Sequence, residues 1–159
     1  MRSRGWIAAI AAAVFALDRI LKILVATHMQ VGESIPVLPP ILWITYITNS
    51  GAAFSLLRHA TWLFIAIAVL ILLGLGWYVA RASELTRRFG VGAGLLAGGT
   101  AGNLWDRVVN GRVIDYIHFR YWAIFNVADV AIVVGIILIV WDFWLKDREH
   151  GEISRRRHG

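Results

Sequence analysis

The chain has 159 residues, 58% of them hydrophobic, and a formal net charge of +6. Soluble domains are about 45–50% apolar, so this composition is typical of a single-domain integral membrane protein. The absence of cysteine excludes disulfides, thiol catalysis and thiolate metal sites, and the five histidines show no ligand spacing, so we expect no metal.

The first apolar segment covers residues 5–27 and follows two arginines. A signal peptide also has a basic start and an apolar core. Here Asp18, Arg19 and Lys22 interrupt the core, and no clean small-residue cleavage site follows. We therefore expect an uncleaved transmembrane helix.

Residues 28–60 contain all three prolines of the chain, which break any helix. The run ILWITYIT is rich in β-branched and aromatic residues and predicts a strand. The next run, NSGAAFSLLRHA, predicts a turn at Asn49–Gly51 and then a short amphipathic helix lying along the membrane surface.

Three further transmembrane helices are predicted at 61–80, 90–109 and 124–145. The first has no charged residue and is long enough to cross about 30 Å of hydrocarbon. The second is rich in glycine, and Gly94, Gly98 and Gly102 recur every four residues, which predicts a ridge that lets neighbouring helices approach closely. A loop joins it to the last helix, and a polar, mobile tail is expected at 146–159.

The basic residues predict how these four helices are oriented. Most of the 16 Lys and Arg residues lie near the two termini or between residues 81 and 90, and fewer lie in the segments on the other side. Because cytoplasmic segments carry an excess of Lys and Arg, we expect both termini to be cytoplasmic. Segment 28–60 and the loop near residues 107–123 then face outward.

In this topology the polar residues of the helices gather at one level, near the outer leaflet. The inner halves of the helices are nearly bare of such groups, which scattered structural polar residues would not explain. The gathered residues are Asp18, Lys22, Asn49, Asn103, Asp106, Arg107, Asp115, Asn126 and Asp129.

Asp115 and Asp129 are the candidate catalytic residues. Aspartate costs roughly 2.5–3.5 kcal/mol at the centre of a membrane helix, so such a residue is a functional hypothesis. On one helix the two would lie about 21 Å apart, but a segment that folds back brings them together. Two adjacent carboxylates share a proton and can activate water, as in aspartic proteases. Spacing alone leaves this dyad and two separate interface carboxylates equally open.

Other readings also remain open at this point. Asp18 and Lys22 share a helix face and form either a structural ion pair or a substrate-side pair. Asp106 is expected to be a local partner of the adjacent Arg107, not a catalyst. A proton- or ion-coupled transporter is the alternative function, although a relay needs polar groups across the whole membrane. A non-enzymatic assembly subunit leaves the aspartates unexplained.

Five blocks in order resemble the bacterial lipoprotein signal peptidases, or signal peptidase II, from the first helix to the last. They are DRILK (Asp18–Lys22), NSGAAF (Asn49–Phe54), GGTAGNLWDR (Gly98–Arg107), GRVIDYI (Gly111–Ile117) and FNVADVAI (Phe125–Ile132). The resemblance implies a single all-α polytopic membrane domain, with four transmembrane helices, a small extracytoplasmic β-element and a surface amphipathic helix.

The resemblance also implies a function. The chain is expected to be an aspartyl endopeptidase of the bacterial inner membrane, without cofactor or nucleic-acid partner and acting as a monomer. It would cut prolipoproteins before a diacylglyceryl-modified cysteine near the outer leaflet, among membrane lipids, and be inhibited by globomycin-type peptides. The motifs assign catalysis to Asp115 and Asp129, a structural pair to Asp18 and Lys22, and the pocket to Asn49, Gly51, Gly99, Asn103, Arg107, Asn126 and Ala128.

Overall fold

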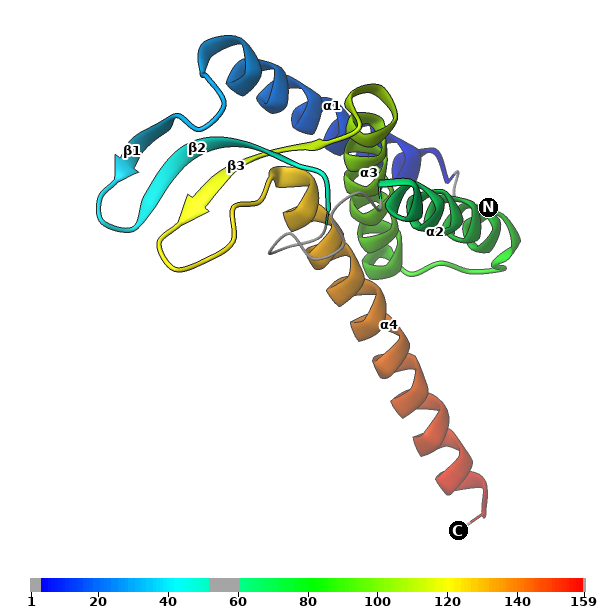
Figure 1. Ribbon diagram of the computed structural model, residues 1–159. Coiled ribbons are helices and arrows are strands. Elements are labelled where there is room, and N and C mark those ends of the chain that lie inside the picture. The colour runs from blue at the N-terminus through cyan, green and yellow to red at the C-terminus, as the bar shows by residue number, and fades with distance from the viewer. Residues whose placement is uncertain (1–3, 52–60, 159) are drawn as a thin grey trace.

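The computed structural model describes residues 4–51 and 61–158, and side chains as far as residue 148. The described elements are four helices and three strands (Figure 1). Their bounds are α1 Gly5–His28, β1 Ser34–Leu38, β2 Leu42–Asn49, α2 Thr61–Arg81, α3 Arg87–Asn110, β3 Val113–Phe119 and α4 Val127–His158. Most of the segment expected to form a surface amphipathic helix lies outside the described residues.

Helix α3 is the centre of the bundle and packs against the other three helices (Figure 1). The predicted glycine ridge is confirmed, because a Cβ on Gly98 would lie 2.6 Å from the backbone oxygen of Ala11 in α1. A second set of glycines faces α4. A Cβ on Gly99 would lie 2.5 Å from the backbone oxygen of Ala128. Glycine thus brings both neighbouring backbones close to α3, near the residues expected to form the site.

The three strands form one antiparallel sheet in the order β1-β2-β3, at the end of the bundle where α4 begins (Figure 1). Strand β2 lies almost where the run ILWITYIT predicts it. Strand β3 corrects the prediction for this segment, which was expected to be a loop. Its register pairs Asn49 with Val113 and Ile47 with Asp115, so β2 holds Asp115 in a fixed position. The chain does fold back between Asp115 and Asp129, as their spacing requires.

Two described helices are long and apolar enough to cross a membrane, Thr61–Arg81 and the Val127–Arg148 part of α4. Helix α2 exposes large apolar side chains along its length, among them Trp62, Leu70 and Trp77. Helices α1 and α3 do not meet the same criterion, because α1 carries charged residues and α3 is rich in glycine. Helix α4 also continues to His158, so most of the segment expected to be a separate tail is helical.

A buried carboxylate that the sequence analysis missed lies between the start of α3 and the middle of α4. Asp142 is 1% exposed and accepts a hydrogen bond from Thr86, the residue that caps α3. Lys146 lies 3.1 Å and Arg88 3.8 Å from its carboxylate oxygens. The expectation that the inner halves of the helices are nearly bare of such groups is therefore wrong at this position.

Candidate active site

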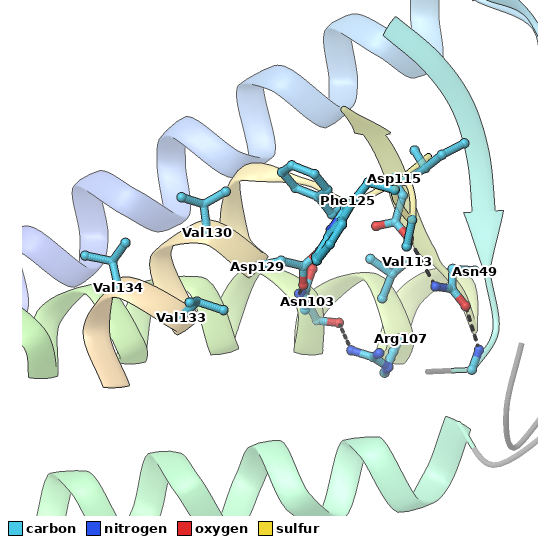
Figure 2. A pocket seen from close by; sticks show the side chains of 14 residues that line it. Asn49, Asn103, Arg107, Val113, Asp115, Phe125, Asp129, Val130, Val133 and Val134 are labelled. Carbon is cyan, nitrogen blue, oxygen red and sulfur yellow. Dashed lines mark hydrogen bonds between the residues drawn. The ribbon is translucent and has the colours of Figure 1, made fainter. Parts of the chain in front are cut away.

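A cavity of about 580 Å³ lies between the sheet, α3 and the start of α4 (Figure 2). Its polar lining comes from four elements, β2, α3, β3 and α4, and includes Asn49, Asn103, Arg107, Asp115 and Asp129. The wall along α4 is apolar and is formed by Val130, Val133 and Val134, all of them exposed. The site thus sets a few polar groups at one end of an apolar surface, as ligand-binding clefts commonly do.

Asp115 reaches the cavity from β3 and is 3% exposed. Asn49 is diagonal to it across the β2–β3 pair, on the same face of the sheet, and its Nδ2 donates to Asp115 Oδ2 at 3.1 Å. The Asn49 side chain is itself held, since its Oδ1 accepts from the backbone N–H of Gly51 at 3.0 Å. Strand pairing therefore fixes both the carboxylate and its donor.

Asp129 reaches the same cavity from the first turn of α4. Asn126 directly precedes this helix, and its Oδ1 accepts from the backbone N–H of Asp129 at 3.0 Å. Asp129 Oδ2 accepts in return from the backbone N–H of Asn126 at 3.1 Å. This reciprocal pair has the pattern of a capping box, so the start of the helix also sets the orientation of the carboxylate.

The amides of Asn103 and Asn126 connect the two carboxylates. Asn126 Nδ2 donates to Asp115 Oδ1 at 2.7 Å, and Asn103 Nδ2 donates to Asp129 Oδ1 at 2.7 Å. Asn126 Nδ2 also lies 3.2 Å from Asn103 Oδ1. Among residues 4–51 and 61–148, no Lys or Arg nitrogen forms an ion pair with either carboxylate, so amide and backbone N–H groups hold them.

The surroundings of Asp115, in a strand outside the membrane-spanning helices, favour its protonated form. The pKa of Asp115 is raised from 3.8 to about 6, chiefly by burial and next by the negative charge of Asp129. The hydrogen bonds from Asn49 and Asn126 oppose this rise. A carboxyl group held in this range can keep or release a proton near neutral pH, as general acid–base catalysis requires.

Beside these carboxylates lies a second group, the ion cluster of Asp18, Arg19, Lys22 and Asp106. Lys22 Nζ lies 2.9 Å from Asp18 Oδ2 and 2.8 Å from Asp106 Oδ2, and Arg19 also pairs with Asp106. The spacing of Asp18 and Lys22 therefore predicts their ion pair correctly. Asp106 binds the cations of α1, not the adjacent Arg107 as expected.

The remaining expected pocket residues fall into two sets. Gly51 and Arg107 line the cavity, and the Arg107 guanidinium lies 4.9 Å from the centroid of the Phe64 ring. Gly99 and Ala128 are not part of the lining and instead form the close backbone contact behind Asp129. Sequence reasoning missed the valines of α4, whose signal is their position one, four and five residues after Asp129 in the same helix.

Comparison with known proteins identifies the family of this chain. The family model described as Signal peptidase (SPase) II matches residues 10–145. A lipoprotein signal peptidase from Pelotomaculum thermopropionicum is 45% identical over 93% of this chain and 97% of its own, and one from Desulfitobacterium hafniense is 42% identical over 86% and 91%. A solved bacterial membrane enzyme superposes with a TM-score of 0.84 at 34% identity, covering 92% of this chain and 91% of its own. The chain therefore belongs to the signal peptidase II family of aspartic peptidases.

Proposed function

We propose that this membrane protein removes signal peptides from prolipoproteins, and that Asp115 and Asp129 are its catalytic dyad. One observation carries the assignment of the residues: carboxylates from β3 and α4 face one cavity and are bridged by Asn126. The names of the relatives, lipoprotein signal peptidases, supply the class of substrate.

The reaction is a direct attack of water on the scissile carbonyl. The ionised carboxylate of the pair takes a proton from water, while the protonated one donates a hydrogen bond to the carbonyl oxygen. The tetrahedral intermediate then collapses, the C–N bond breaks, and the leaving amine receives a proton from the pair. Because the two carboxylates titrate as a unit, the shared proton belongs to the pair.

The substrate is a prolipoprotein whose cysteine already carries a diacylglyceryl group, and the cut falls directly before that cysteine. The apolar wall of Val130, Val133 and Val134 supports this substrate, because it begins at Asp129 and continues along α4. Acyl chains against this wall leave the adjacent peptide bond beside the polar end of the cavity.

The same proposal includes an arrangement in the bacterial inner membrane. All four helices span it, both termini are cytoplasmic, and the dyad lies near the outer leaflet. The apolar exposed surfaces of α2 and α4 support spanning, and the excess of Lys and Arg in the terminal segments supports the orientation. The enzyme acts as a monomer, and globomycin-type cyclic peptides block the cavity.

The test is cleavage by the purified protein in detergent. The substrate is a prolipoprotein carrying diacylglycerol on its cysteine, and the matched control is the same polypeptide without the lipid. We expect mass spectrometry to show a product that begins at the lipidated cysteine, and no comparable cleavage of the control. No cleavage of the lipidated substrate, or equal cleavage of both, would contradict the proposal.

A further inference from the structure

Lys22 of α1 reaches the carboxylate pair through Asn103, although it does not line the cavity. Its side chain is 0% exposed, and its Nζ donates to Asn103 Oδ1 at 2.9 Å. Asn103 in turn donates to Asp129. A buried cation on one helix is thus two hydrogen bonds away from a carboxylate on another.

The position of the Lys22 ammonium is fixed from several sides. An ammonium has three N–H donors, and three oxygens lie within 3 Å of Nζ, one each from Asp18, Asp106 and Asn103. Gly102 makes room for this arrangement, since a Cβ there would lie 2.4 Å from Asp18 Oδ2. The ion cluster carries two positive and two negative formal charges, so it is balanced without the dyad.

Donor chemistry then decides how the Asn103 amide is turned. A carboxamide has an acceptor end and a donor end, whereas an ammonium can only donate. The end of Asn103 that faces Lys22 is therefore its oxygen, which also accepts from Asn126 Nδ2. Its nitrogen is left to face Asp129, where it donates at 2.7 Å. The reversed amide would set a carbonyl oxygen against a carboxylate oxygen.

We infer that Lys22 is a positioning residue for catalysis: its contact with Asn103 keeps the amide turned so that Nδ2 holds Asp129. This inference rests on the proposed function, because it assumes that Asp129 is catalytic. It goes beyond a purely structural ion pair, in which Lys22 would serve only to neutralise Asp18 and Asp106. The two roles differ in what happens to turnover when Asn103 is absent.

A double-mutant cycle separates the roles. The paired substitution Asp18→Asn/Lys22→Met keeps the ion cluster balanced, with Arg19 against Asp106, but removes the donor to Asn103. We expect kcat for the lipidated prolipoprotein to fall about 100-fold, since small misplacements of catalytic groups have effects of this size, while KM changes less than about threefold. In an Asn103→Ala background the same pair should lower kcat less than about threefold.

A donor control completes the experiment. Asp18→Asn/Lys22→Gln has the same charge balance as the methionine pair but restores an N–H donor, and we expect it to recover at least about tenfold in kcat over that pair. Equal losses in the presence and absence of Asn103, or no recovery with glutamine, would overturn the positioning role. The wild-type enzyme distinguishes failure of the positioning role from failure of the proposed function. If the wild type does not cleave the lipidated substrate, the proposed function itself fails.

Discussion

The proposed dyad and the ion cluster lie next to each other and share Asn103, yet their carboxylates have different partners. Asp18 and Asp106 are fully buried and paired with lysine and arginine. Asp115 and Asp129 are held by amide and backbone N–H groups and face the cavity. The carboxylate group therefore occurs in two different environments that are adjacent in the folded protein.

This difference in partners indicates which carboxylates are suited to acid–base catalysis. An opposite charge close to a carboxylate favours its charged form. A buried carboxylate held by neutral donors beside a second carboxylate is stabilised less, so the pair can retain a proton. Asp142 also lies beside cations, Lys146 and Arg88, although it is at the other end of the bundle.

The largest expected effect is on catalysis by the dyad. Asp115→Asn and Asp129→Asn should each lower cleavage of the lipidated prolipoprotein by about 1,000-fold or more, because each removes a group that exchanges the proton. Both proteins should still insert and purify normally. Asp142→Asn is the matched control and should retain cleavage within about threefold. Substantial cleavage by either Asp115→Asn or Asp129→Asn would contradict the catalytic role proposed for the carboxylates that face the cavity.

The next effect is on stability, where we expect the ion cluster to matter more than the proposed dyad. Asp106→Asn leaves Lys22 and Arg19 with only one buried counter-ion, so we expect it to lower the free energy of unfolding by about 3–5 kcal/mol. Asp115→Asn should cost much less at neutral pH, because the raised pKa means that its ionised form is already disfavoured in the folded protein. Thermal unfolding in detergent compares the two variants. A larger loss in Asp115→Asn would reverse the comparison.

The smallest effect concerns the pH dependence. Asn49 donates to Asp115 and so lowers its pKa, and Asn49→Leu should raise this pKa above about 6. The pair then keeps its proton to higher pH, and the alkaline limb of the pH–rate profile should move upward by about 0.5–1 unit. The control is Asn110→Leu, at the exposed end of α3. A downward shift with Asn49→Leu would show that this hydrogen bond does not stabilise the charged form.

Local sequence patterns predict much of this fold. The helices expected at 5–27 and 61–80 nearly coincide with α1 and α2, and the β-branched run nearly coincides with β2. Strand β3 was missed because its pairing with β2 joins residues far apart in the chain, although VIDYIHF has the β-branched and aromatic content of a strand. The start of α3 was placed too late because Thr86 was not recognised as its cap.

The polar members of the candidate site could be predicted from the sequence, but its apolar wall and most of its contacts could not. The cost of burying charge singled out Asp115 and Asp129, the expected topology placed the asparagines near them, and motif resemblance gave the asparagines a role in the pocket. No spacing rule indicates that Asn126 bridges the two carboxylates, or that Lys22 contacts Asn103, because both depend on how three separate segments pack. Asp142 was missed because its partners come from another helix and from its own following turn.

Asn126 has a consequence for how this protein can change in evolution. The same side chain caps α4 and holds Asp115, so we expect most substitutions there to disturb both the start of the helix and the proposed dyad. A substitution that improves the cap at this position should then also disturb the proposed reaction. A screen for thermostable enzymes should therefore recover changes along the lipid-facing sides of the helices and leave position 126 as asparagine.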